Sequence, residues 1–362
     1  MSEVKYFLPL KSDRLLDVLR GIAVLMVIMI HLAFTLYNFN KSSSSADELK
    51  SITDFARYGS AGPMLFFLIS GFLLESLYYK KYSSKVFFKR RLARIYPMWV
   101  LFTLVSILSA YTTGFYGDGV KLDSLYNVLI AVLFLGFLGI FIPSTWDFIP
   151  GGWSIEGEVV NYLTFPLIRK FSMVTIVVLQ SCYAVMVIVF QNINLGEAYA
   201  GFLRSSQIIS TATFWFILGV IVSRLAMKTL TVTPKLIIAG TLFITINLFL
   251  NAPNNISQWQ SAVAIIIALA LGLLVEKKLN FFAKLISEIG KYSYGIYLIH
   301  FIFLTAVANV SVKIFSSISD SNIFITLGLS FACFIVVTVL SFYFAKLVYK
   351  YYELPFINKA KK

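Results

Sequence analysis

The chain contains few of the residues from which disulfide frameworks and metal centres are built. Only two cysteines and two histidines occur among its 362 residues. Cys182 and Cys333 both fall in apolar segments. Because a metal site needs several ligands at close spacing, we expect neither a disulfide framework nor a bound metal.

Charged residues are also scarce: they make up 13% of the chain, and hydrophobic residues make up 59%. Soluble domains have roughly 25% charged and 45–50% apolar residues, and the mean hydropathy here is +0.82. This composition excludes an ordinary soluble domain and predicts a polytopic membrane protein. The net charge of +14 does not indicate nucleic-acid binding, because Lys and Arg cluster in short connecting segments as the positive-inside rule requires.

A cleavable signal peptide is not recognisable at the start of the chain. The first apolar run, 18–37, is long enough to span a bilayer, and no small-residue cleavage site follows it. We expect it to act as an uncleaved anchor. The serine tract at 42–45 predicts a flexible, solvated loop.

Apolar segments recur along the whole chain, and eleven of them are candidate membrane spans. They are 18–37, 58–79, 95–113, 125–143, 158–168, 171–190, 208–227, 235–252, 261–275, 292–315 and 322–348. Basic residues mark the expected cytoplasmic loops, among them Lys277, Lys278, Lys284 and Lys291. This pattern places both termini in the cytoplasm.

The number of crossings follows from the charges. Between the basic segment 80–94 and Arg169 the number of crossings must be even, yet three candidates lie there. One of 125–143 and 158–168 therefore does not cross, and we expect a re-entrant or interfacial segment near 144–168, lining a protein cavity. The prediction is an all-α, polytopic transmembrane bundle of about ten crossings, with a single membrane-embedded domain over 1–362 and no fused soluble domain.

Arg20 and His31 lie eleven positions apart in the first apolar run. At ~100° and ~1.5 Å per residue, a helix would place them within ~20° of one face and ~16 Å apart along its axis. Ionisable residues in a membrane helix predict a functional site: Arg20 suits a phosphate, and His31 suits proton abstraction. The alternative is that Arg20 snorkels to the interface and His31 bonds to a neighbouring helix.

Arg91 and Arg94 form a second candidate group. They are i, i+3 neighbours on one helical face, so both can bind one polyanion. The alternative reading is a plain positive-inside anchor for the next span.

A third group surrounds the short apolar segment, where Glu158 can orient a histidine or bind sugar hydroxyls and Trp153 can stack on a sugar ring. The alternative is a solvated loop with an interfacial tryptophan. His300, taken alone, is typical of a helix-packing histidine, and Ser70 of a small packing residue. The candidate substrate-binding residues are Trp153, Ser154, Tyr162 and His300.

These motifs follow one another in a fixed order along nearly the whole chain. They are Leu16-Asp17 to Arg20 with ten residues before His31, Phe66 to Leu73, Arg91 to Pro97, Trp153 to Ile155 with Glu158, Tyr162 and Pro166, Tyr292 to His300, and Tyr352 to Pro355. Together they resemble the acyltransferase-3 family of integral membrane acyltransferases, which includes bacterial O-antigen acetyltransferases.

The resemblance implies an O-acetyltransferase of the bacterial inner membrane. It implies acetyl-CoA as the cytoplasmic acyl donor and a hydroxyl of an extracytoplasmic glycan or lipid-linked saccharide as the acceptor. It also implies that His31 and Arg20 are the essential pair, with Arg91 and Arg94 on the cofactor side. His31 either deprotonates the acceptor or takes the acyl group first, and Glu158 orients the histidine or the acceptor.

Two departures from the family pattern concern the substrate. Family members usually have an aromatic residue where Asn161 stands, so the lining near Glu158 differs. Many relatives carry a fused extracytoplasmic hydrolase-like domain, for which this chain has no residues left. The rival interpretation is a proton-coupled transporter or flippase that uses Arg20, His31 and Glu158 as a polar pathway. The acceptor sugar, its hydroxyl, the acyl length and the oligomeric state stay open.

Overall fold

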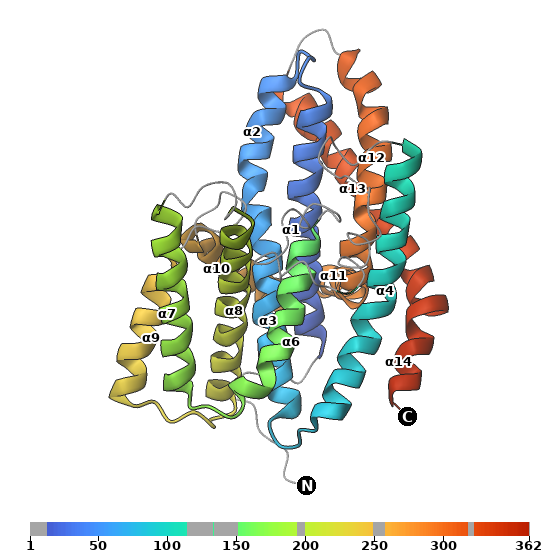
Figure 1. Ribbon diagram of the computed structural model, residues 1–362. Coiled ribbons are helices and arrows are strands. Elements are labelled where there is room, and N and C mark those ends of the chain that lie inside the picture. The colour runs from blue at the N-terminus through green and yellow to red at the C-terminus, as the bar shows by residue number, and fades with distance from the viewer. Residues whose placement is uncertain are drawn as a thin grey trace. The chain divides into compact units, whose positions relative to one another are not determined.

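A computed structural model of the chain describes residues 13–113, 133, 151–193, 200–248, 258–317 and 322–361. These residues form helices and contain no β-strand, which confirms the all-α prediction (Figure 1). Seven helical stretches among them are long and apolar enough to cross a membrane. The chain is therefore a multi-pass membrane protein. The expected span 125–143, apart from residue 133, lies outside the described residues.

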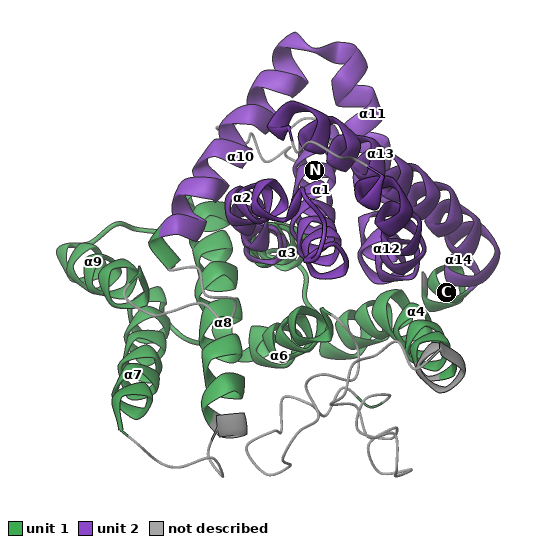
Figure 2. Ribbon diagram, turned by 90° about the horizontal axis from the view of Figure 1, so that it is seen from above, with its two compact units in different colours: residues 1–11, 67–259, 356–362 green, residues 12–66, 260–355 purple. Residues whose placement is uncertain are grey.

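The chain divides into two compact units, coloured separately in Figure 2. Unit 1 is built mainly from Phe67–Trp259, and unit 2 from Ser12–Phe66 and Gln260–Pro355. The helices of unit 2 are α1 (Asp13–Phe39), α2 (Ala46–Ala56), η1 (Arg57–Ala61), α10 (Gln258–Lys278), α11 (Asn280–Lys291), α12 (Ser293–Ser316) and α13 (Ile323–Val348). A π-helical turn, η4 (Tyr349–Glu353), and α14 (Leu354–Lys361) follow α13.

Helix α1 is the centre of unit 2 and packs against α2, η1, α11, α12 and α13. Its closest approach is to α11, where two glycines let the backbones touch. A Cβ atom on Gly21 would overlap the carbonyl oxygen of Ile286, and one on Gly290 would overlap the carbonyl oxygen of Asp17. Small residues at such crossings are how helices pack closely in membranes. The contact holds α11 against the start of α1.

Gly290→Ala is expected to destabilise the protein by about 1–3 kcal/mol, because the added methyl group meets rigid backbone. Gly328→Ala is the matched control: Gly328 also lies in a helix of unit 2, α13, but a Cβ there meets nothing within 4 Å. Thermal unfolding in detergent would compare the two variants. Equal midpoints would contradict the close α1–α11 contact.

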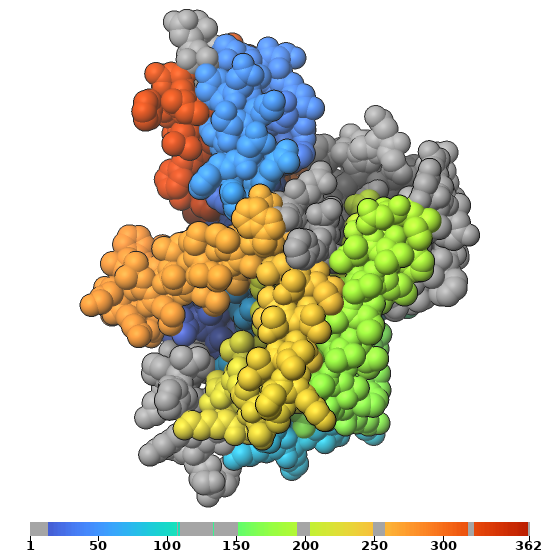
Figure 3. Space-filling view, turned by 90° about the vertical axis from the view of Figure 1, so that its left-hand side faces the viewer, coloured from blue at the N-terminus to red at the C-terminus, as the bar shows by residue number. Residues whose placement is uncertain are grey.

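Unit 1 contains most of α3 (Gly62–Tyr78), with α4 (Ser84–Thr113), α6 (Gly152–Ile168), α7 (Met173–Asn192), α8 (Ala200–Ala226) and α9 (Pro234–Leu248). Helices α6 and α7 both pack against α8, and α7 also packs against α9. Figure 3 shows α7 in light green beside α9 in yellow. Apolar side chains such as Leu179 and Ile238 are exposed on these two helices, as expected of surfaces that face lipid.

Several expected boundaries differ from the structure. The prediction of a basic loop around Lys277–Lys291 is wrong, because Asn280–Lys291 forms the helix α11. Ala283, Ser287 and Gly290 recur at helical spacing and are buried, so this short segment gains tertiary packing as a helix. The span expected at 58–79 begins at Gly62, after α2 and η1, and the one expected at 235–252 is the 15-residue α9.

The segment expected to be re-entrant or interfacial is only partly described. Its second half is α6, a helix of 17 residues that begins at Gly152. Gly151 precedes it with φ of 74°, a left-handed conformation that glycine adopts without strain. The expected segment 158–168 lies within α6. That one of 125–143 and 158–168 does not cross the membrane stays a prediction.

Candidate functional site

Unit 2 brings the only two histidines of the chain together. His31 comes from α1 and His300 from α12, and His31 Nδ1 lies 2.9 Å from His300 Nε2. The Phe301 ring packs on both, with its centroid 4.7 Å from that of His31 and 4.1 Å from that of His300. His300 is completely buried, whereas His31 is partly exposed. Of the two rings, only that of His300 is completely buried.

The hydrogen bonds of this pair define its protonation. His300 Nδ1 lies 3.2 Å from the carbonyl oxygen of Ile296, and a carbonyl only accepts, so His300 Nδ1 carries the proton. In the neutral ring His300 Nε2 is then the acceptor, and His31 Nδ1–H must be the donor. This leaves the lone pair of a neutral His31 on Nε2, for which no partner is found in the described part of the chain. The pair thus leaves one basic nitrogen, His31 Nε2, without a hydrogen bond in the described part of the chain.

Arg20 lies on the same helix as His31. Helix α1 is continuous from Asp13 to Phe39, so the spacing of ~16 Å along its axis applies. Arg20 Nη1 is 2.9 Å from Asp17 Oδ1, and both side chains are largely buried, with 21% and 16% exposure. The i, i+3 spacing of Asp17 and Arg20 is the signal for this ion pair in the sequence.

Unit 1 contains a second polar group, centred on Glu158 of α6. Its Oε1 accepts hydrogen bonds from the Tyr162 hydroxyl and, at 3.3 Å, from the Ser70 hydroxyl of α3. The guanidinium of Arg91, on α4, lies 5.8 Å from the centre of the Tyr162 ring. The carboxylate of Glu158 thus joins α6 to α3, and Tyr162 connects it to Arg91 of α4. The residues of this polar group all belong to unit 1.

The hydrogen bond of Ser70 is not evident in the sequence. Ser70 stands among phenylalanines and leucines, which predicts a packing residue, and its partner Glu158 is 88 positions away. Asn161 has a different role from lining the space near Glu158. It is fully buried, and its amide donates to the carbonyl oxygen of Ala212 on α8, at 3.2 Å. It therefore ties α6 to α8.

The remaining candidate residues are Trp153, Ser154 and Arg94. Trp153 and Ser154 lie in the first turn of α6, where the Ser154 hydroxyl donates to the Gly151 carbonyl at 3.2 Å. Arg94 is exposed on α4. Both cysteines are free thiols, and no cluster of three or more metal-binding side chains occurs within the described residues.

Comparisons with known proteins identify a family and one similar protein. An acyltransferase-domain family, acyltransferase-3, matches residues 13–346. Nodulation protein 10 of Rhizobium leguminosarum bv. viciae is similar at 26% identity over 180 residues, which cover 45% of this chain. The match spans about half of that relative, 48% of its length. No solved structure matches the chain significantly. The match across nearly the whole chain shows that it belongs to the acyltransferase-3 family and is a multi-pass membrane acyltransferase.

Proposed function

We propose that this acyltransferase moves an acetyl group from cytoplasmic acetyl-CoA to a hydroxyl of an extracytoplasmic glycan or lipid-linked saccharide. The family supports acyl transfer, and the identities of donor and acceptor are our proposal. The observation that carries it is the His31–His300 hydrogen bond, because it leaves one oriented basic nitrogen on His31. We place the enzyme in a bacterial inner membrane as one membrane-embedded domain with both termini cytoplasmic.

In the proposed reaction, His31 Nε2 removes the proton of the acceptor hydroxyl as its oxygen attacks the thioester carbonyl. Collapse of the tetrahedral intermediate breaks the carbon–sulfur bond, and the imidazolium returns the proton to the departing CoA thiolate. Protonation of Nε2 turns the bond from His31 Nδ1–H to His300 into a charge-assisted one, which is stronger. His300 therefore stabilises the charge that develops on His31. A variant in which His31 first accepts the acyl group uses the same nitrogen.

The polar group on Glu158 is the proposed place for substrate hydroxyls. A carboxylate that already binds two hydroxyl groups, those of Ser70 and Tyr162, has the chemistry to exchange one of them for a sugar hydroxyl. Trp153 offers an aromatic face in the first turn of the same helix. We keep Glu158 as the orienting carboxylate and Trp153, Ser154 and Tyr162 as proposed substrate-binding residues.

The phosphates of the donor are proposed to bind Arg20, Arg91 and Arg94. Arg94→Ala is expected to raise the KM for acetyl-CoA about tenfold, since a charge-assisted bond contributes about 1.5 kcal/mol. Lys89→Ala is the matched control, because Lys89 is also an exposed cation of α4 but points about 140° away from Arg94 in the helical projection. Initial rates at varied acetyl-CoA would check this. An unchanged KM for Arg94→Ala would contradict the assignment.

The test of the function is transfer of radiolabelled acetyl groups from acetyl-CoA to extracytoplasmic glycan in membranes that contain the protein. Acceptor-dependent incorporation is expected. The rival transporter or flippase would not consume acetyl-CoA in an acceptor-dependent way, so hydrolysis or transfer that ignores the acceptor would contradict the proposal. Matched membranes without the protein provide the background.

A further inference from the structure

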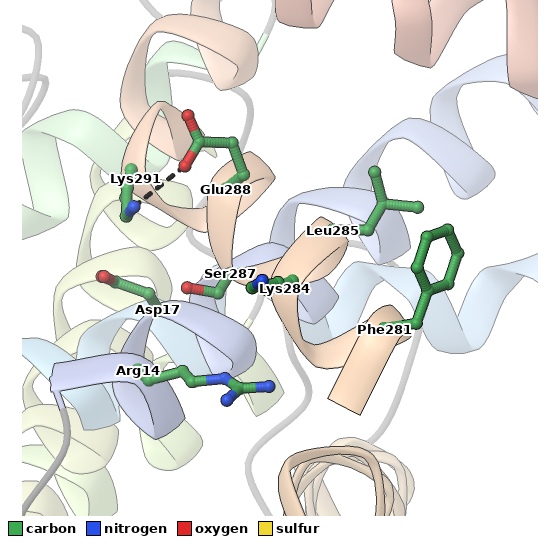
Figure 4. A pocket seen from close by; sticks show the side chains of 8 residues that line it. All are labelled: Arg14, Asp17, Phe281, Lys284, Leu285, Ser287, Glu288 and Lys291. Atoms are coloured by element: carbon green, nitrogen blue, oxygen red, sulfur yellow. Dashed lines mark hydrogen bonds and ion pairs between the residues drawn. The ribbon is translucent and has the colours of Figure 1, made fainter. Parts of the chain in front are cut away.

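Unit 2 contains an open cavity of about 720 Å³ between the first turns of α1 and helix α11. Figure 4 shows its lining: Arg14 and Asp17 project from α1, and the other labelled side chains project from α11. None of these residues is proposed to bind the acyl donor or the acceptor, although Asp17 pairs with Arg20. The volume is in the range of small-molecule sites.

The charges in this cavity leave a positive excess. Arg14, Lys284 and Lys291 line it against two carboxylates, Asp17 and Glu288. Both carboxylates already have cationic partners: Asp17 bonds to Arg20, and Glu288 bonds to Lys291 at 2.9 Å. Lys284 makes no ion pair within the described part of the chain.

Two of the cations have defined positions and charge. Arg14 Nη2 donates to the backbone oxygen of Asn280 at 3.0 Å and to its side-chain oxygen at 2.6 Å. These bonds hold the guanidinium at the N-terminal end of α11. The hydrogen bond to Glu288 raises the pKa of Lys291, so this amine stays protonated at neutral pH. Arg14 and Lys291 therefore present fixed positive charge to a ligand, and Lys284 adds a third cation to the lining.

An apolar surface continues from the charged part of the cavity. Phe281 and Leu285 line the cavity and are 74% and 52% exposed, and the neighbouring Phe282 is 51% exposed. The opposite face of α11 is buried against α1. A short helix with exposed aromatic residues beside lysines is typical of one that lies in the membrane interface.

We propose that this cavity binds the phosphate headgroup of an anionic phospholipid, with the acyl chains along Phe281 and Leu285. The charge is complementary, and basic pockets beside membrane helices are known to suit anionic headgroups. A phosphodiester accepts hydrogen bonds from Lys284 and Lys291, while the exposed phenylalanines lie at the depth of the acyl chains. The ligand would thus clamp α11 against the start of α1, the helix that carries Arg20 and His31.

The test is a titration of the purified full-length protein in detergent with a fluorescent phosphatidylglycerol, and with phosphatidylcholine of the same chains. Phosphatidylglycerol is expected to bind more tightly. Lys284→Gln should weaken that binding about fivefold, the effect of one lysine near an anionic surface. Lys278→Gln is the matched control, since it removes an equal, exposed charge just before α11 but outside the cavity; it should bind as wild type does.

Three results would overturn the proposal. Equal affinity for the two lipids would remove the headgroup as the ligand. Equal weakening by Lys284→Gln and Lys278→Gln would leave only diffuse surface charge. Displacement of the labelled lipid by free coenzyme A, with the same loss in Lys284→Gln, would assign the phosphate to the acyl donor. Because the readout is lipid binding, the result is independent of whether the acyl-transfer proposal holds.

Discussion

His31→Ala is expected to lower the rate of acyl transfer by about 10²–10⁴-fold, the usual contribution of a general base. The reason is that the lone pair on His31 Nε2 is the one basic group that the His31–His300 bond leaves oriented and available. The measurement is initial-rate incorporation of labelled acetyl groups at saturating acetyl-CoA, with protein amount checked in the same membranes. Incorporation equal to that of wild type would remove His31 from the catalytic centre.

Variants of His300 separate positioning from catalysis. His300→Leu removes the acceptor for His31 Nδ1–H, so the imidazole can adopt the other tautomer, with its proton on Nε2. We expect kcat to fall about tenfold or more with little change in KM. His300→Gln retains an oxygen acceptor and should recover much of the loss. A purely structural role would predict that both variants lose folded protein in proportion to activity, and rescue by glutamine would contradict it.

The parts of the site that lie on one helix could be predicted from the sequence. The spacing of Arg20 and His31 is a property of α1 alone, so the expected common face follows from helical geometry. The pairing of His31 with His300 could not be read in this way, because 269 positions separate them and only the packing of α12 on α1 brings them together. The same holds for Ser70 and Glu158.

The sequence predicts a loop where α11 forms, for a different reason. Lys277, Lys278, Lys284 and Lys291 satisfy the positive-inside rule equally well on a loop or on an interfacial helix. The decisive signal was the apolar pattern between them, since small and apolar residues recur every three or four positions and form the face buried against α1. Charge density alone therefore predicts a side of the membrane but not the local structure.

Glu75 forms a buried ion-pair group that the sequence does not reveal. It stands at the end of an apolar run, and its partners, Arg169 and Arg224, are 94 and 149 positions further along the chain. The structure buries its side chain to 1% exposure. Arg224 Nε lies 2.9 Å from one carboxylate oxygen, and Arg169 Nη1 lies 3.7 Å from the other. Helices α3 and α8 are thus joined through one buried acid.

Glu75→Gln is expected to destabilise unit 1 by about 3–5 kcal/mol, because removing one partner leaves buried charge uncompensated. Both arginines are mostly buried, with 14% and 17% exposure, so water can compensate only part of the loss. The measurement is the thermal unfolding midpoint of the purified protein in detergent, followed by tryptophan fluorescence.

Asp54→Asn is the matched control for this prediction. It breaks the ion pair of Asp54 with Arg57, 3.2 Å apart, whose side chains are 55% and 44% exposed, and exposed pairs contribute about 0–1 kcal/mol. A midpoint that falls as little for Glu75→Gln as for Asp54→Asn would show that the Glu75 pair does not stabilise the fold. The folded fraction of Glu75→Gln should retain the wild-type KM for acetyl-CoA, because Glu75 is absent from the proposed donor and acceptor sites. A raised KM would instead make Arg169 or Arg224, once released from the carboxylate, part of substrate binding.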